Sequence, residues 1–405
     1  MRSARRSKSW SASSPRRRGA GSSTCWTRRG TKMSSDQRRF MARAIQLAWR
    51  GRYTTHPNPR VGCVLVRDGE IVGEGYHRRA GEPHAERNAI AAAGERARGA
   101  CAYVTLEPCC HHGRTPPCTD GLIEAGVRRV VAAMVDPNPL VAGQGLRALE
   151  QAGIETSSGL LEGEARALNP GFIRRMSSGL PYVRCKLAMS LDGRTAMASG
   201  ESKWITGAEA RADVQRLRAM GDAILTGIGT VLADDPSMNV RLGGDGPQPL
   251  RVVLDPRLHM PEQARMLALP GRTLVVHAPA PAGDEALAGR AERLRGAGAE
   301  VRELPGDGSR IDLGALLAHL GGRGVNEVLI EAGATLAGEA LWQGLVDELV
   351  IYAAPHLMGS EGRGLFNMPQ LQRVRDRVEL DITDLRMVGR DLRISVRPRR
   401  RTGEE

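Results

Sequence analysis

Aromatic residues make up only 3% of this 405-residue chain, and it contains no run of 18 or more uninterrupted apolar residues. The scarcity of aromatic residues argues against a surface that binds single-stranded nucleic acid by stacking bases on Phe and Tyr. The lack of long apolar runs excludes a transmembrane helix, which needs about 20 apolar residues. The other fractions, 41% hydrophobic and 25% charged, are typical of a globular protein, and the length predicts two or three domains.

Acidic residues are absent from residues 1–33, which contain eight Arg and two Lys. This segment contributes +10 of the net charge of +13 and leaves only +3 for the rest of the chain. Four arginines near the C-terminus more than account for this remainder: Arg397, Arg399, Arg400 and Arg401. The body of the protein is therefore close to neutral, which does not favour a basic groove for nucleic acid.

Residues 1–33 also lack the apolar core that a secretory signal peptide needs. Two interpretations stay open. The segment is an organellar transit peptide, since it is rich in Arg and Ser, or it is an extension upstream of a start at Met33. Nothing in it can pack into a core, so we expect a disordered, basic and dispensable extension.

Seven cysteines are too few and too unevenly spaced for a disulfide scaffold. Three of them, Cys109, Cys110 and Cys118, lie within ten residues, beside two histidines. This pattern suits a metal site in a reducing compartment.

Strand patterns alternate with helix patterns along the chain, which indicates α/β architecture. A capped helix is expected from Ser35 to about residue 50, followed by a hairpin that turns at Asp68-Gly69. A helix over 162–176 leads to a boundary at Ser-Ser-Gly-Leu-Pro, and a different α/β series begins at Tyr182. The expected divisions are an extension at 1–33, domains at 34–179 and 180–397, and a tail at 398–405.

Two segments indicate a metal site: PHAE (83–86) at the start of a helix and PCCHHGRTPPC (108–118) after a strand. One His and two thiolates would leave a fourth tetrahedral position for water. A Glu two residues after the His could then shuttle protons without binding the metal, as in zinc deaminases. Zinc lowers the pKa of a bound water toward ~7, which would make it a nucleophile near neutral pH.

The usual deaminase motif ends in PCxxC, whereas here Cys118 comes nine positions after Cys109. Cys110, His111 and His112 lie between them and are rival ligands. We favour Cys109 and Cys118 because each follows a proline.

The second half contains KLAMSLDGRTAMASGESKWIT (186–206) and IEAGATLAG (330–338). The latter predicts a strand, a glycine turn and a helix N-terminus, whose N–H groups can bind a phosphate. On its own this pattern does not distinguish a phosphate site from an ordinary strand-to-helix turn.

The segments at 58–66, 75–86 and 105–131 closely resemble the bifunctional riboflavin-biosynthesis deaminase/reductase family. The segments at 186–196, 199–206, 230–241 and 331–338 resemble its reductase half, so the likeness covers about residues 33–397. The resemblance implies an N-terminal three-layer α/β/α cytidine-deaminase-like domain followed by a dihydrofolate-reductase-like α/β domain.

For the first domain, the resemblance implies one zinc per chain, held by His84, Cys109 and Cys118, with Glu86 as the catalytic proton carrier. Substrate-side positions are Asn58, His77, Arg114 and Thr115.

For the second domain, the resemblance implies NADPH as the cofactor. Cofactor-facing positions are Ala188, Trp204, Thr230, Asp234, Gly333, Ala334, Thr335, Leu336, Ala337, Gly338 and Glu339. Substrate-facing positions are Ser202, Arg218, Met238, Arg241 and Glu331. Arg218 and Arg241 suit a ribose phosphate, because a guanidinium can bind two oxygens at once. Pro256 departs from the family, which often has Ser there, so a cofactor hydrogen bond at this position is in doubt.

The implied function is two steps of riboflavin synthesis on a phosphoribosylaminopyrimidine: zinc-dependent deamination, then NADPH-dependent reduction of the ribosyl group. We expect a cytoplasmic homo-oligomer without nucleic-acid or membrane partners, unless residues 1–33 direct organellar import. The rival interpretations are a nucleic-acid-editing deaminase, which the near-neutral body disfavours, and a pseudoenzyme with one active half, which the intact motifs disfavour.

Overall fold

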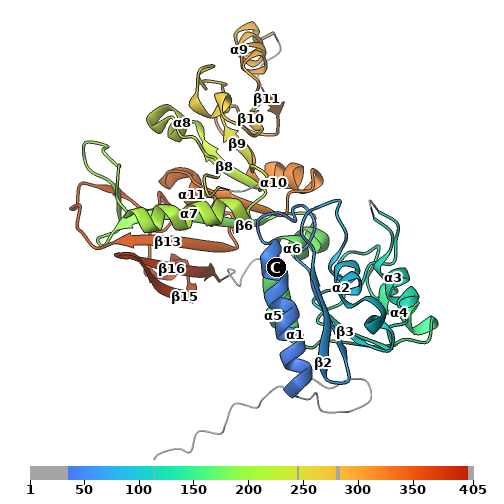
Figure 1. The fold of residues 1–405 in the computed structure, drawn as a ribbon. Coiled ribbons are helices and arrows are strands. Elements are labelled where there is room, and N and C mark those ends of the chain that lie inside the picture. Colours follow the sequence, from blue (N-terminus) through green and yellow to red (C-terminus); the bar gives the residue numbers. More distant parts are fainter. Residues whose placement is uncertain (1–34, 114, 244–245, 280–282, 400–405) are drawn as a thin grey trace, which may run out of the picture.

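The structure is a computed structural model that describes residues 35–113, 115–243, 246–279 and 283–399. The expected extension at 1–33 and the candidate residue Arg114 lie outside these ranges. The described chain forms a five-stranded sheet, a nine-stranded sheet and a two-stranded ribbon (Figure 1). No helix in the described ranges is long and apolar enough to cross a membrane.

The N-terminal sheet has the strand order β2-β1-β3-β4-β5. Its strands are β1 (Gly62–Arg67), β2 (Glu70–Tyr76), β3 (Cys101–Val104), β4 (Arg129–Ala132) and β5 (Glu155–Ser158). The expected hairpin joins β1 to β2, and Asp68 and Gly69 both have positive φ at its turn. β1 also pairs antiparallel with β3, whereas β3, β4 and β5 are parallel. We did not expect β5, whose residues Glu-Thr-Ser-Ser are polar.

Helices cover both faces of this sheet (Figure 1). One face carries α1 (Ser35–Ala48) and α5 (Glu162–Leu168), and the other carries α2 (Ala85–Ala93), α3 (Cys118–Glu124) and α4 (Gln144–Gln151). Glycines allow close approach on both sides: a Cβ at Gly62 would collide with the Ala44 carbonyl of α1, and one at Gly75 with the Ala85 carbonyl of α2. The expected three-layer α/β/α arrangement is confirmed.

The single helix expected over 162–176 is two helices, so that prediction was wrong. α5 ends at Leu168, and α6 (Pro170–Ser178) begins after Asn169. Pro170 is the first residue of α6, because a proline has no N–H to continue the preceding helix.

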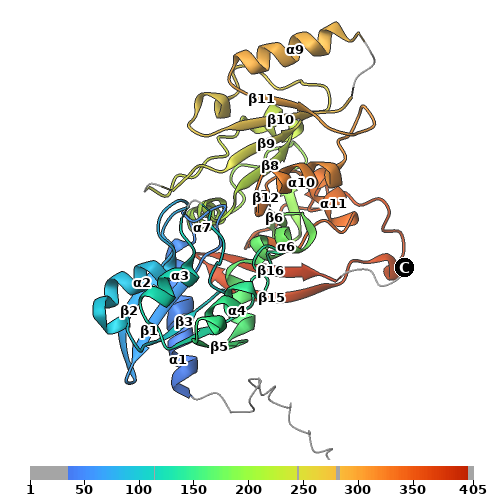
Figure 2. The ribbon, with the colours of Figure 1, turned by 90° about the vertical axis from the view of Figure 1, so that its right-hand side faces the viewer.

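The C-terminal sheet has the order β11-β10-β9-β8-β12-β6-β13-β16-β15, seen along its length in Figure 2. Its seven parallel strands are β6 (Tyr182–Ser190), β8 (Ala223–Gly227), β9 (Leu250–Leu254), β10 (Thr273–His277), β11 (Glu300–Glu303), β12 (Glu327–Ile330) and β13 (Glu348–Ala354). β16 (Asp391–Pro398) and β15 (Leu380–Val388) add an antiparallel hairpin at one edge. β16 thus runs one residue into the expected tail.

Helices cover both faces of this sheet as well, as a buried parallel sheet requires. α10 (Leu313–Gly322) and α11 (Ala334–Trp342) pack on one face, and α7 (Ala208–Met220), α8 (Ile228–Asp234) and α9 (Glu285–Gly296) pack on the other. β7 (Arg194–Ala196) and β14 (Arg363–Gly364) form the ribbon. Short 3-10 turns occur at Trp49–Gly51, Gly94–Ala97, Arg265–Ala268 and Val374–Asp376.

Candidate active sites

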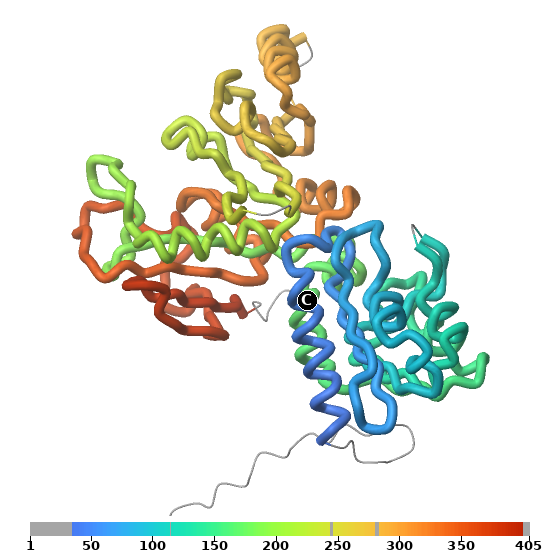
Figure 3. Tube along the Cα trace, viewed as in Figure 1, coloured from blue at the N-terminus to red at the C-terminus, as the bar shows by residue number. Residues whose placement is uncertain are grey.

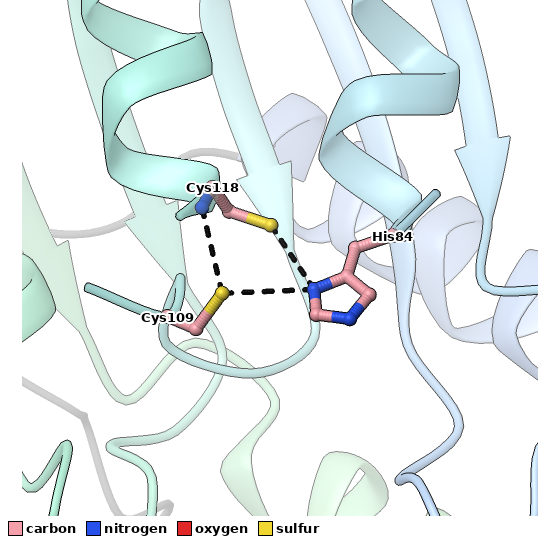
Figure 4. A group of neighbouring side chains, drawn as sticks. All are labelled: His84, Cys109 and Cys118. Atoms are coloured by element: carbon pink, nitrogen blue, oxygen red, sulfur yellow. Dashed lines mark hydrogen bonds between the residues drawn. The ribbon is translucent and has the colours of Figure 1, made fainter. Parts of the chain in front are cut away.

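His84, Cys109 and Cys118 converge in the N-terminal domain (Figure 4). His84 is the N-cap of α2, Cys118 is the first residue of α3, and Cys109 follows β3. Nδ1 of His84 lies 3.3 Å from the Cys118 sulfur and 3.6 Å from the Cys109 sulfur. One imidazole nitrogen and two sulfurs within 4.8 Å of one another fit a zinc ion.

Of the three groups, Cys109 is the one whose protonation already favours metal binding, whereas hydrogen bonding to Cys109 and burial raise the pKa of the Cys118 thiol. A hydrogen bond from the Cys118 thiol, together with His84, lowers the pKa of Cys109, so Cys109 is a thiolate that also accepts the Cys118 N–H at 3.4 Å. Hydrogen bonding to Cys109 raises the pKa of His84. Thiolates are the form that binds zinc, and the metal displaces the remaining protons.

The rival ligands do not join this cluster. Among the described residues, the group close enough to share a metal is His84, Cys109 and Cys118 alone. Cys110 is partly exposed, and His111 and His112 are exposed. The preference for the two proline-flanked cysteines therefore agrees with the geometry.

Glu86 is buried in the first turn of α2, with 3% of its surface exposed. Burial, followed by the nearby Cys109, raises the pKa of its carboxyl group to about 7. A carboxyl that can take up and release a proton near neutral pH suits general acid–base chemistry.

Three residues surround His84. Thr115 Oγ lies 3.4 Å from His84 Nε2, and the His77 ring stands edge-on to the His84 ring at 5.0 Å. Nε2 of His77 lies 3.1 Å from the Asn58 side-chain amide nitrogen. Of the four expected substrate-side residues, three therefore lie around His84, and Arg114 lies outside the described residues.

Sequence reasoning missed Glu107, two residues before Cys109. Its buried carboxylate accepts backbone N–H bonds from Asp136, Gly143 and Leu146 at 3.0, 2.9 and 3.1 Å. These bonds fasten the ligand-bearing segment to the segment after β4. The only sequence signal was an acidic residue next to a buried strand.

In the C-terminal domain, Glu331 is the centre of an ion cluster. Its carboxylate contacts Arg218 of α7 at 2.5 and 3.0 Å and Lys186 of β6 at 3.2 Å. Burial alone would raise the pKa of this carboxyl, but the charges of Lys186 and Arg218 outweigh burial and lower it to about 2. The cluster lies where β8 and β12 end beside the middle of β6, since Glu331 N–H bonds to the Leu225 carbonyl and Ile330 pairs with Cys185.

Two strand-to-helix turns lie at this edge. Gly227 ends β8 and caps α8, and Gly333 follows β12 and caps α11. Neither helix has a side-chain cap, so its first N–H groups are available to an anion. A Cβ at Gly333 would meet nothing within 4 Å, which leaves room for a cofactor to approach.

The other cofactor-facing candidates are grouped near these turns. Ala188 lies at the end of β6 and Thr230 in α8, both partly exposed. The Lys203 ammonium lies 2.9 Å from the Asp234 carboxylate at the end of α8 and brings the loop that carries Ser202 and Trp204 to that helix. The Trp204 ring is 71% exposed and stacks against the Arg211 guanidinium.

Three candidates are buried: Met238, Ala337 and Gly338. The Met238 side chain is buried beside Val231 and Ile224. Ala337 is fully buried, and a Cβ at Gly338 would collide with the Asn367 carbonyl. The roles that the resemblance implies for these three positions therefore stay predictions, and any contact made there would involve the backbone. Within the turn, Gly333 and Thr335 are exposed, and Ala334, Leu336 and Glu339 are partly exposed.

The two arginines of the expected phosphate clamp differ in their exposure and in their hydrogen-bond partners. Arg218 is held by Glu331 and also donates to the Asn239 carbonyl at 3.0 Å. Arg241 is exposed and contacts the Asn239 side chain at 2.6 Å. Burial and the nearby Arg218 charge lower the pKa of Arg241, as expected where two cations lie close together.

Pro256, where the family often has Ser, accepts a hydrogen bond through its carbonyl from the Ala278 N–H at 3.3 Å.

Comparisons with known proteins match both halves of the chain. Residues 34–134 match the cytidine and deoxycytidylate deaminase zinc-binding region, and residues 181–394 match the RibD C-terminal domain. The chain is 52% identical to the riboflavin biosynthesis protein RibD of Escherichia coli K12, covering 87% of this chain and 97% of that protein. It is 48% identical to the Haemophilus influenzae RibD, covering 91% and 99%.

Solved structures match over the same extent. Acinetobacter baumannii RibD aligns with a TM-score of 0.82 and 46% identity, covering 90% of this chain and 99% of that one. A Thermotoga maritima diaminohydroxyphosphoribosylaminopyrimidine deaminase/5-amino-6-(5-phosphoribosylamino)uracil reductase aligns with a TM-score of 0.78 and 34% identity, with the same coverage. The chain, with its His/Cys/Cys zinc site and its NADPH-dependent second half, belongs to the RibD family of bifunctional deaminase/reductases of riboflavin biosynthesis.

Proposed function

We propose that the N-terminal domain deaminates 2,5-diamino-6-(5-phosphoribosylamino)pyrimidin-4-one and that the C-terminal domain then reduces the ribosyl group. The product of the two steps is 5-amino-6-(5-phosphoribitylamino)uracil. The expected domain limits, 34–179 and 180–397, are part of this proposal. The single observation that carries it is the pair of separate clusters, one of metal-binding type around His84 and one at the strand ends around Glu331.

In the deaminase domain, His84, Cys109 and Cys118 would hold zinc, which when bound would activate a water for attack on the amine-bearing carbon. Glu86 carries a proton toward the leaving amino group. Its burial and its position two residues from His84 support this role.

Asn58, His77, Arg114 and Thr115 form the substrate side of the deaminase site. Burial lowers the pKa of His77, so its imidazole is neutral at pH 7. A neutral imidazole and an amide can donate and accept hydrogen bonds, which suits the polar edge of a pyrimidine. For Arg114 the support is the family motif alone.

In the reductase domain, NADPH supplies the hydride, and the protein supplies placement and charge. The turns at Gly227 and Gly333 would hold the cofactor phosphates, and Trp204 would face the cofactor. Arg241 binds the ribose phosphate, with Arg218 and Glu331 holding the substrate beside it. Exposure of the Arg241 guanidinium and its closeness to Arg218 support this division of roles.

Mass spectrometry of the products made from the diaminopyrimidine, with and without NADPH, tests both steps. Without NADPH, we expect a product whose mass corresponds to replacement of one amino group by an oxo group. With NADPH, we expect the product to gain two further hydrogens. A product reduced but not deaminated would overturn the assignment of order.

We also propose that two copies of the chain associate through β15. Four apolar side chains on one face of this edge strand are 40 to 67% exposed: Leu380, Ile382, Leu385 and Met387. Their register with β16 continues the face on which Val396 is buried in the domain core. A second copy would cover this face by symmetry. Sedimentation of Ile382→Glu should show monomers, whereas Ile71→Glu, at an exposed site on β2, should sediment like wild type.

We infer that the protein works in the cytoplasm. The six described cysteines are free, and the zinc ligands must be reduced to bind metal. Import of residues 1–33 fused to a reporter into an organelle would instead support the transit-peptide interpretation.

A further inference from the structure

The docking loop, residues 55–60, lies between α1 and β1 where the two domains meet (Figure 3). Nδ1 of His56 lies 2.7 Å from an Asp222 carboxylate oxygen, and the Pro57 carbonyl accepts a bond from the Asn326 side chain at 2.7 Å. Asp222 directly precedes β8, and Asn326 directly precedes β12. A loop of the N-terminal domain is therefore attached to the start of two reductase strands.

Arg60 makes the most buried contact of this loop. Only 3% of Arg60 and 3% of Glu327 is exposed, and the guanidinium lies 2.9 Å from the carboxylate. Arg60 also donates to the Leu168 carbonyl at 2.6 Å and the Met220 carbonyl at 3.2 Å. The second Glu327 oxygen lies 3.3 Å from Arg184 of β6.

A buried ion pair is weak evidence for stability, because removing two charges from water costs about as much as their attraction returns. Such a pair is better explained when it fixes the position of one segment of the chain relative to another. The Arg60–Glu327 pair joins residues 267 positions apart, one from each domain.

The docking loop also carries Asn58, two residues before Arg60. The Asn58 amide contacts His77, and the His77 ring stands edge-on to His84. One short segment thus contacts the reductase strand β12 through Arg60 and the surroundings of the zinc site through Asn58.

We propose that the reductase domain positions Asn58 for deamination, with Arg60 and Glu327 as the positioning residues. The inference rests on the substrate-side role of Asn58 given under Proposed function. When the pair is broken, the docking loop loses its buried tie to the reductase domain. The Arg60 backbone keeps its two bonds to Asn169 of the N-terminal domain, so the loop stays folded but Asn58 shifts within the deaminase site. Small displacements of a substrate-contacting group are enough to weaken catalysis strongly.

Glu327→Gln in the full-length zinc-loaded protein tests the proposal from the reductase side. We expect the KM for deamination to rise about tenfold, within the range for residues coupled in one network. The kinetic constants for NADPH-dependent reduction of the deaminated substrate, and the zinc content, should stay within about twofold of wild type. Should this variant not fold, Asn326→Ala tests the attachment of the loop without changing a charge, by removing the bonds of Asn326 to Pro57 and to Arg175.

The matched control is Tyr352→Phe. It removes a buried 2.6 Å hydrogen bond to Asp213 in the same domain and touches no residue of the docking loop. A deamination KM that rises equally in both variants would show general destabilisation and overturn the proposal.

The double variant Arg60→Met/Glu327→Gln adds a second criterion. If the two residues act through one anchor, the double variant should lose no more deaminase activity than the worse single variant, whereas additive losses would overturn the proposal. Asn58→Ala distinguishes the substrate role of Asn58 from its positioning by the reductase domain. A normal KM in Asn58→Ala would refute its substrate role, whereas a raised KM there with a normal KM in Glu327→Gln would refute the coupling alone.

Discussion

The Thr115 hydroxyl lies 3.4 Å from Nε2 of His84, while Nδ1 of the same ring faces the two cysteine sulfurs. A partner on the outer nitrogen of a ligating histidine fixes the orientation of its ring, and losing such a partner typically costs 10–100-fold in metal affinity. Thr115→Val keeps the shape of the side chain and removes the hydroxyl. We expect it to lower zinc affinity about tenfold in a chelator competition assay, with Thr115→Ser close to wild type. An unchanged affinity in the Val variant would assign Thr115 to the substrate alone.

Replacing Cys118 by Ala should remove the zinc, because only two protein ligands remain. Cys110→Ala should keep about one zinc per chain, since Cys110 lies outside the ligand cluster. Metal analysis of the two purified proteins measures this. Zinc loss from the Cys110 variant would show that the ligand set is wrong.

Glu86→Gln should stop deamination and spare reduction. Gln is nearly isosteric but cannot carry a proton, and loss of general acid–base catalysis typically costs ~10²–10⁴-fold. Glu86 belongs to α2 and has no contact with the docking loop among its described interactions. NADPH consumption on the deaminated substrate should therefore stay near wild type, and an equal fall in both activities would contradict the independence of the two sites.

Glu331→Gln should make the protein less stable in a pH-dependent way. The pKa of Glu331 is about 2 in the fold, below the ~4.3 of a free Glu, so its ionised form stabilises the fold above about pH 5. That contribution is lost as the pH falls toward 2. Breaking a buried ion pair costs about 3–5 kcal/mol, so we expect a gap of that size at pH 7 that narrows between pH 5 and pH 3.

Denaturant unfolding at several pH values measures this gap. Glu262→Gln, in an exposed pair with Arg293, is the control and should change stability by less than about 1 kcal/mol at any pH. A Glu331→Gln gap that stays constant from pH 7 to pH 3 would contradict the depressed pKa.

The zinc site could be predicted from the sequence because its chemistry is local. His84 and Glu86 share one helix turn, and Cys109 and Cys118 share one short segment. The alternation of strands and helices was likewise predictable, since each element shows its own periodicity.

The contacts that join distant segments could not be predicted. Arg60 and Glu327 are ordinary charged residues in the sequence, and only the fold makes them neighbours. The same holds for Glu107, whose three partners lie 29 to 39 residues away. The β15–β16 hairpin, by contrast, does have a sequence signal: apolar and polar residues alternate on both sides of Gly389.

β12 has a carboxylate at each end of the same face, since Glu327 and Glu331 are four residues apart and side chains alternate along a strand. Glu327 meets Arg60 at the domain boundary, and Glu331 meets Arg218 at the reductase site. A one-residue insertion or deletion within this strand would turn one of the two carboxylates to the opposite face. The length of this strand is therefore fixed by both of its carboxylates, and engineered chimaeras of the two halves should leave Glu327–Glu331 intact.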